Sequence, residues 1–192
     1  MRDLTFVTGN QHKADYLAKW LGLPLPHQKV DLDELQSLDL REVVEHKARG
    51  AYAQLQNPVL VEDVALTFHG MGRLPGTLIK WFLEELGTER LCSLANSLPD
   101  NTATASIMYG LYNGHELHIF AGEVHGRIAP EVRSLAGNDW KSALSWNSLF
   151  IPDGSTKTYA EMTDEELEPF SHRAQAIAKL RAYLQNLDNS SK

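Results

Sequence analysis

The chain has 192 residues, of which 43% are hydrophobic and 22% charged, and its formal net charge is −7. This length suits one domain with a substantial core, and the composition excludes a disordered or a membrane-spanning chain. The acidic balance argues against a general nucleic-acid-binding surface, because such binding depends on accumulated lysine and arginine.

The compartment is indicated by what the sequence lacks. Cys92 is the single cysteine, so no internal disulfide can form, and no cluster has the spacing of zinc ligands. The N-terminus has neither the long apolar stretch nor the small-residue cleavage site of a signal peptide. We therefore expect a cytoplasmic protein.

The first half of the chain alternates predicted strands and helices. A buried strand is expected over 4–8, and a helix from Asn10 that ends at Gly22 and Pro24. The stretch "KVDLDEL" (29–35) indicates a short strand that runs into acidic residues. Asp39 and Glu42 have the spacing of a capping box, which would open a helix that extends to about Gln56.

The second half is richer in strands. "PVLVEDVAL" (58–66) predicts an apolar strand interrupted by Glu62-Asp63, and helical stretches follow over 77–86 and 88–97. Residues 102–128 alternate β-formers around a predicted hairpin turn at Asn113-Gly114, and 145–151 is a further strand candidate.

The end of the chain is predicted to be helical. Thr163 and Glu166 indicate another capping box, and a closing helix starts at Ser171, while 188–192 are expected to form a disordered tail. The whole order favours a mixed α/β fold over a doubly wound nucleotide-binding sheet.

The stretch "FVTGNQHK" (6–13) is the first candidate for chemistry. Asn-Gly-type turns often reverse a hairpin, but a strand that ends in Thr8, Gly9 and Asn10 and then opens a helix can hold an anion on exposed N–H groups. Lys13 lies in the first helical turn, where a cation opposes the helix dipole by about 0.3–1 kcal/mol. Lys13 is either a solvated surface residue or a ligand for a bound anion.

Lys47 shares the apolar face of its predicted helix with Val43, Val44 and Ala51. A lysine that points inward needs a partner, because an unpaired buried charge is very unfavourable. Two partners are open: a carboxylate in an internal salt bridge, or a phosphate group of a ligand.

Carboxylates form the third group of candidates. Glu62 and Asp63 are adjacent in a predicted strand, so only one is expected to enter a given cleft. With Glu34 they offer the hard oxygen ligands that Mg²⁺ prefers, and each alone could be a solvated charge. Together with the two lysines they describe a Mg²⁺–polyphosphate site.

Ser171, His172 and Arg173 open the last predicted helix. Serine is a common helix cap, whereas histidine and arginine at a helix start suit hydrogen bonds to a ligand edge or a phosphate. A Ser-His hydrolase is disfavoured, because adjacent residues rarely face each other for proton transfer and the sequence has no G-x-S-x-G elbow. A P-loop NTPase is excluded by the lack of a Walker loop.

These motifs, in this order, resemble the inosine triphosphate pyrophosphatase (ITPase, or XTP/dITP diphosphatase) family over about residues 4–187. The resemblance rests on the stretches "FVTGNQHK", "VDLDE", "PVLVEDVAL", "GRLPGTLIKWF", "PDGSTKTYAEM" and "SHRAQA". It implies one domain over 1–187: a long curved mixed β-sheet with flanking helices, in two lobes around a central cleft. It also implies a homodimer, and Mg²⁺-dependent hydrolysis of non-standard purine nucleoside triphosphates to monophosphate and pyrophosphate.

The resemblance also implies roles for individual residues. Those expected to hold the triphosphate are Thr8, Gly9, Asn10, Lys13 and Lys47, and those expected near the base and sugar are Trp146, Asn147, Ser171, His172 and Arg173. Asp63 would activate the attacking water, with Glu62 beside it, and Glu34 would bind or orient the metal.

The chain departs from the family pattern on the base side. Leu144 stands where an aromatic residue is expected, Asn147 where an aspartate is expected, and Leu167 where a lysine is expected. A lost stacking platform costs about 1–3 kcal/mol, and a lost charged hydrogen bond about 1.5–3 kcal/mol. Either Lys80 or Lys157 is a candidate to replace the lysine missing at 167.

Two functions are consistent with these residues. One is an active hydrolase of ITP, dITP or XTP, with an inosine-like or altered base preference. The alternative is a nucleotide sensor or regulatory subunit that binds such ligands with little turnover and signals to an effector protein. The changes at 144, 147 and 167 beside an intact triphosphate motif motivate the alternative.

Overall fold

A computed structural model describes residues 4–133 and 145–190, and the chain divides into two compact units. Unit 1 comprises the described residues up to Asp63, Ile107–Gly122, and the described residues from Arg173 onward. Unit 2 comprises the described residues of Val64–Ser106 and Glu123–His172.

The strands form a seven-stranded mixed sheet in the order β2-β1-β3-β5-β6-β7, with β4 paired to β3. Their bounds are β1 Thr5–Val7, β2 His27–Gln28, β3 Val59–Phe68, β4 Pro75–Gly76, β5 Thr102–Tyr112, β6 Leu117–Ile128 and β7 Phe150–Pro152. β1 pairs in parallel with β2 and β3, whereas the β3–β4 and β6–β7 pairs are antiparallel. This arrangement confirms the predicted mixed α/β class.

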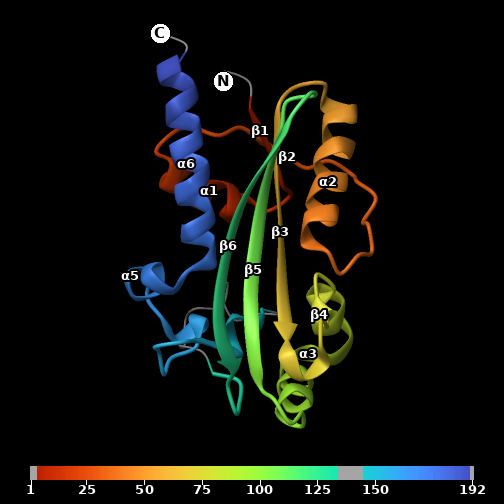
Figure 1. The fold of residues 1–192 in the computed structure, drawn as a ribbon, viewed down its shortest axis with the longest axis vertical. Coiled ribbons are helices and arrows are strands. Elements are labelled where there is room, and N and C mark those ends of the chain that lie inside the picture. Colours follow the sequence, from red (N-terminus) through yellow and green to blue (C-terminus); the bar gives the residue numbers. More distant parts are fainter. Residues whose placement is uncertain (1–3, 134–144, 191–192) are drawn as a thin grey trace. The chain divides into compact units, whose positions relative to one another are not determined.

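The α-helices among the described residues are α1 Gln11–Leu21, α2 Leu40–Leu55, α3 Ile79–Asn96, α5 Asp164–Leu167 and α6 His172–Ser190. Short 3₁₀ turns occupy His69–Met71, Trp146–Ser148, Tyr159–Glu161 and Glu168–Phe170. In this part of the chain there is no helix with the length and hydropathy needed to cross a membrane. In Figure 1, α6 runs beside β6, where Lys179 Nζ donates to the carbonyl of Ala121 at 2.6 Å.

Several local signals are confirmed. The side chain of Asn10 accepts from the backbone N–H of Lys13 and caps α1, which ends at Gly22 with φ 69°. Asn113 Oδ1 accepts two backbone N–H groups in the turn between β5 and β6. Thr163 and Glu166 form the predicted capping box. These signals depend on neighbouring residues only, which is why the sequence reveals them.

The helix between β4 and β5 is broken as the sequence indicates. α3 spans Ile79–Asn96, but Gly87 inside it has φ 73° and ψ 169°, which is not helical. Glycine adopts such a conformation without steric cost. The two helical stretches predicted on either side of residue 87 are therefore confirmed.

Four local predictions are wrong, and the strand expected over 145–151 is correct only in its last residues, because Trp146–Ser148 form a 3₁₀ turn and β7 begins at Phe150. Residues 29–35 contain no strand, because β1 pairs instead with His27–Gln28. β3 continues through Glu62 and Asp63 without interruption. Asp39 caps α2 through its side chain, but Glu42 does not complete a capping box with it. The backbone N–H of Asp39 donates to Ser37 Oγ, and the Glu42 carboxylate accepts from the Ser37 hydroxyl. Residues 188–190, expected in a tail, belong to α6.

The core of unit 1 brings α2 close to the sheet. Val44 of α2 is fully buried, and a Cβ added at Gly110 of β5 would lie only 2.6 Å from Val44 Cγ1. A side chain at residue 110 would therefore push α2 away from the strand. Since α2 carries Lys47 on the same face as Val44, this close packing also fixes where the Lys47 side chain begins.

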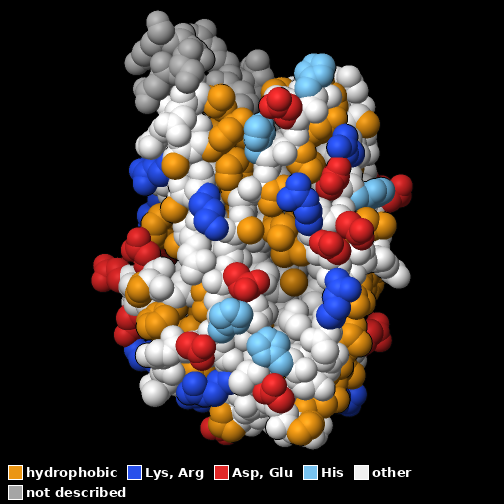
Figure 2. Space-filling model, in the orientation of Figure 1, with side chains coloured by type: hydrophobic (Ala, Val, Ile, Leu, Met, Phe, Trp, Pro, Cys, Tyr) orange, Lys and Arg blue, Asp and Glu red, His pale blue; other side chains and the backbone are white. Residues whose placement is uncertain are grey.

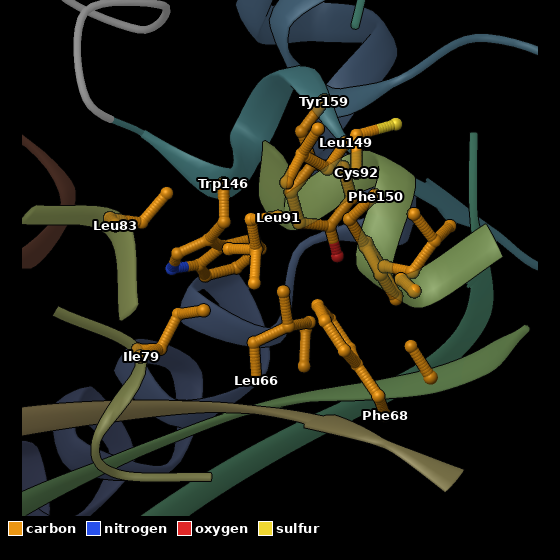
Figure 3. Packing of buried hydrophobic residues seen from close by; sticks show 14 of the residues in the cluster. Leu66, Phe68, Ile79, Leu83, Leu91, Cys92, Trp146, Leu149, Phe150 and Tyr159 are labelled. Carbon is orange, nitrogen blue, oxygen red and sulfur yellow. The ribbon is translucent and has the colours of Figure 1, made fainter. Parts of the chain in front are cut away.

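The core of unit 2 is an aromatic and aliphatic cluster (Figure 3). Trp146 lies within it at 8% exposure, with its ring centroid 6.1 Å from that of Phe150 and 6.0 Å from that of Tyr159. Phe150 comes from β7, whereas Trp146 and Tyr159 come from two short 3₁₀ turns. Segments with little regular structure are thus held by aromatic packing, which contributes beyond area burial alone.

Candidate active site

The turn between β1 and α1 exposes polar groups, as the sequence predicts. Thr8 Oγ1 accepts from the backbone N–H of Asn10 at 3.1 Å, and Asn10 Oδ1 accepts from the N–H of Lys13 at 3.3 Å. Gly9, Asn10 and Lys13 are exposed and Thr8 is half-buried. The turn therefore presents a hydroxyl, backbone donors and a lysine at the positive end of an 11-residue helix.

Glu62 is a buried carboxylate of unit 1 with two cationic partners. Its side chain is 4% exposed, and Lys13 Nζ lies 2.8 Å from Oε1. Arg173 Nη1 donates to Oε2. Burial by itself would raise the pKa of Glu62, but the charges of Arg173 and Lys13 outweigh it and hold the pKa below its ordinary value. Glu62 is therefore a carboxylate at neutral pH.

Lys47 reaches from α2 to Asp63, the residue that follows Glu62 in β3. Its Nζ donates to Asp63 Oδ2 and to the backbone carbonyl of Glu62, each at 3.0 Å. Both side chains keep some access to solvent, at 33% exposure for Lys47 and 26% for Asp63. Of the two partners the sequence left open for Lys47, the structure shows the carboxylate.

The alternation of β3 separates the two acids. Glu62 is buried, whereas Asp63 is half-buried, as expected for adjacent strand residues that point to opposite faces. Each acid has its own cations: Lys13 and Arg173 for Glu62, and Lys47 for Asp63. One strand thereby joins the first, second and last long helices of unit 1 through charged side chains.

Glu34 lies in an irregular segment and is exposed. Within residues 4–133 and 145–190, no group of three histidine, cysteine, aspartate or glutamate side chains is arranged to hold a metal ion. Glu34 is thus not part of a preformed cage with Glu62 and Asp63. Its role toward a metal stays a prediction.

The residues predicted near the base and sugar fall mainly in unit 2, with Arg173 in unit 1. Trp146 is part of the core, and its ring centroid lies 5.5 Å from that of His172. The His172 ring is also stacked on the Tyr159 ring, with 5.8 Å between centroids. Ser171 is buried and its N–H donates to the carbonyl of Glu168 at 3.2 Å. These positions fix the local backbone, and their contact with a ligand stays a prediction.

The three departures from the family pattern have different surroundings. Leu144 lies outside the described residues. Asn147 is half-buried and its N–H donates to Ser145 Oγ at 3.2 Å. Leu167 packs against the hydrophobic core of unit 2, so an aliphatic residue suits that position.

The candidates to replace a lysine at 167 are engaged locally. Lys157 Nζ lies 2.5 Å from Glu166 Oε1, next to Leu167 in the sequence. Lys80 Nζ lies over the Trp81 ring, 5.0 Å from its centroid. Lys157 is therefore the cation placed beside α5.

One residue of the site was not found from the sequence. Tyr109 of β5 is fully buried, and its hydroxyl accepts from Arg173 Nη1 at 2.8 Å. In the sequence it is one β-former among many over 102–112, and nothing local distinguishes its hydroxyl. Its role follows from the tertiary structure alone.

Charged side chains are distributed without a single-sign patch on the face drawn in Figure 2, where acidic and basic groups alternate. The cations of the candidate site are instead gathered around two carboxylates. A few convergent cations suit a small polyphosphate ligand better than a long polyanion.

The sequence is similar to a known protein family and to named enzymes. The Ham1 family model matches residues 4–183. The inosine triphosphate pyrophosphatase of Schizosaccharomyces pombe is 36% identical over 193 residues, which cover 98% of each chain. The enzyme of that name from Yarrowia lipolytica is 36% identical, covering 98% of this chain and 99% of its own.

Solved structures agree on the fold. A HAM1 protein from Coxiella burnetii superposes with a TM-score of 0.81 at 23% identity, over 97% of this chain and all of its own. The resemblance read from the motifs is thereby confirmed over nearly the full length. The match to the family model and the 36% identity to two relatives over nearly the full length show that this chain belongs to the Ham1 family.

Proposed function

We propose that this protein hydrolyses non-standard purine nucleoside triphosphates, such as ITP, dITP and XTP, to the monophosphate and pyrophosphate. Two of its relatives at 36% identity are named inosine triphosphate pyrophosphatase. The observation that carries the proposal is the pairing of Lys13 with Glu62 and of Lys47 with Asp63 on one strand, beside the exposed turn of α1.

The triphosphate would be held by that turn and the two lysines. Thr8, Gly9 and Asn10 offer a hydroxyl, the backbone N–H of Gly9 and a side-chain amide, and the start of α1 favours negative charge. Lys13 and Lys47 supply the positive charge that a leaving pyrophosphate requires, because negative charge accumulates on it in the transition state.

Asp63 would be the general base. Its carboxylate takes a proton from water, the water oxygen bonds to the α-phosphorus, and the bond from that phosphorus to the α–β bridging oxygen breaks. Pyrophosphate leaves and the monophosphate remains. Lys47 at 3.0 Å from Oδ2 orients the Asp63 carboxylate.

A magnesium ion fits the donor set if substrate shares it. Mg²⁺ is usually held by one or two carboxylates together with phosphates and water. Glu62 is held ionised by its partners, and Asp63 is the more accessible of the two, with Glu34 as a third candidate. When bound, the ion would neutralise charge on the phosphates.

The base and sugar would be read by residues near Asn147 and the Ser171–Arg173 triplet. Asn147 has both a donor and an acceptor, whereas an aspartate could only accept. We therefore propose a base preference that differs from that of family members with an acid at this position. We further propose that the protein acts as a cytoplasmic homodimer.

A second function is favoured by the substitutions at 144, 147 and 167. In that case the protein binds a modified purine triphosphate, turns it over slowly or not at all, and reports to an effector protein. The triphosphate-holding residues would serve binding equally well in both cases.

A substrate panel with separate detection of pyrophosphate and phosphate tests both functions. We expect Mg²⁺-dependent release of pyrophosphate from ITP, dITP or XTP. Absence of turnover for every triphosphate, combined with tight binding by calorimetry, would instead support the sensor. Absence of both turnover and binding would overturn the two functions together.

A further inference from the structure

Tyr109 is a fully buried tyrosine whose hydroxyl has a charged partner. Its ring packs near Phe6, with 6.5 Å between centroids, and its Oη accepts from Arg173 Nη1 at 2.8 Å. Burial raises the pKa of this phenol well above its ordinary value, despite the opposing charge of Arg173. The hydroxyl is therefore neutral throughout the physiological range and adds no charge to the site.

Arg173 is fixed at one of its two terminal nitrogens. The two hydrogens of Nη1 are used by Glu62 Oε2 and by Tyr109 Oη, which lie on different strands, β3 and β5. A guanidinium is planar and carries five N–H donors in a fixed fork. Holding Nη1 from two directions therefore sets the plane of the whole group.

The remaining donors of Arg173 stay available for a ligand. Within the part of the chain that the structure describes, no acceptor is found on Nε or Nη2, and the side chain is 22% exposed. The ion pair alone would not need the hydroxyl, because Glu62 already supplies Arg173 with an anionic partner. The hydroxyl instead adds direction to the contact.

We propose that Tyr109 is a positioning residue for substrate: with Glu62 it orients Arg173 so that its Nε and Nη2 donors meet acceptor oxygens of the nucleotide. This inference rests on the proposed function, in which Arg173 contacts the substrate. The acceptor oxygens could belong to a phosphate or to the nucleoside, and both have the same hydrogen-bonding chemistry.

The test is Tyr109→Phe, which removes one oxygen and keeps the buried ring. Tyr112→Phe is the matched control, because Tyr112 lies on the same strand and its hydroxyl also accepts from an arginine, Arg49 Nη1, at 3.2 Å. We expect Tyr109→Phe to weaken ITP binding by about tenfold and to raise KM with little change in kcat. Tyr112→Phe should remain within about twofold of the wild type.

A double-mutant cycle separates positioning from a general effect on folding. If Tyr109 acts through Arg173, Tyr109→Phe should cause no further loss of ITP affinity in an Arg173→Lys background. An equal loss in both backgrounds, or no loss in the single variant, would overturn the inference. Calorimetry with inorganic tripolyphosphate identifies the acceptor: a loss there as well assigns it to the phosphates, and a loss confined to ITP assigns it to the nucleoside.

Binding and turnover are measured on the same samples, so the two proposals fail separately. A wild type that binds ITP without turnover overturns the hydrolase function, while the cycle still tests Tyr109. A wild type that hydrolyses ITP, with Tyr109→Phe unchanged in affinity, overturns the role of Tyr109 alone. A wild type that does neither overturns both.

Discussion

Lys13 Nζ and Glu62 Oε1 lie 2.8 Å apart, joining an exposed helix start to a buried strand position. The lysine side chain is 43% exposed, whereas the glutamate is 4% exposed. An exposed ion pair contributes little, but a buried carboxylate that loses its cations is strongly unfavourable. Loss of the pair is therefore more unfavourable for the buried Glu62 than for the exposed Lys13.

Glu62→Gln should destabilise the protein by about 3–5 kcal/mol, because the change leaves the half-buried guanidinium of Arg173 without its anion. Urea unfolding followed by circular dichroism measures the loss. Glu45→Gln is the control, since Glu45 pairs with Arg49 in an exposed contact within α2. A loss for Glu62→Gln as small as that for Glu45→Gln would contradict the buried-pair interpretation.

The same carboxylate should make stability depend on acid pH. The pKa of Glu62 is lower in the folded state than the value of about 4.3 for an unfolded glutamate. The Glu62 carboxylate contributes fully to the free energy of unfolding above the unfolded pKa. That contribution is lost as pH falls toward the folded pKa, because the unfolded state binds more protons in this range. Unfolding free energies measured from about pH 7 down to about pH 3 should fall less steeply in Glu62→Gln than in the wild type. Parallel pH profiles would refute this.

Asp63→Asn should abolish most turnover while leaving nucleotide binding. General-base catalysis contributes about 10²–10⁴-fold, and an amide cannot accept the proton of the attacking water. Pyrophosphate release from ITP gives the rate, and calorimetry gives the affinity. Asp15→Asn on the exposed side of α1 is the control. Retention of more than about a tenth of the wild-type kcat would exclude Asp63 as the base.

Trp146→Ala should lower the free energy of unfolding by about 3–5 kcal/mol, because the ring fills the core of unit 2. Trp81→Ala is the comparison, since Trp81 is 44% exposed and its loss should stay within about 0.5 kcal/mol. Chemical denaturation of both variants gives the difference. Equal stability of the two would mean that Trp146 is not a core residue.

Asn147→Asp should change base preference without affecting the phosphate end. A charged hydrogen bond is stronger than a neutral one by an amount that corresponds to about tenfold in kcat/KM. We expect the ratio of kcat/KM for ITP to that for GTP to change by about this factor. An unchanged ratio would show that residue 147 does not read the base.

The sequence predicts the parts of this site that depend on local pattern. Asn10 as a cap and Lys47 on the apolar face of α2 follow from spacing along one helix. Lys47 needed an anionic partner because of its position, and Asp63 provides one. Such inferences succeed because each concerns one element and its own periodicity.

Other features depend on which strands pair. β3 continues through Glu62 and Asp63 because the sheet supplies its partners, although two adjacent acids are unfavourable for a strand taken alone. The second strand is likewise decided by pairing with β1, which pairs with His27–Gln28 and not with the predicted segment 29–35. Tyr109 and Arg173 meet only in the folded chain, so no sequence pattern could reveal their hydrogen bond.

The two cations on Glu62 come from opposite ends of the chain. Lys13 lies in the first helix and Arg173 near the start of the last, and one carboxylate in β3 contacts both. Shortening the protein past either residue would leave the Glu62 carboxylate with one cationic partner in place of two. Both terminal helices must therefore be synthesised before this three-residue contact can form, so in a nascent chain that still lacks α6 Glu62 has Lys13 as its one partner of the two.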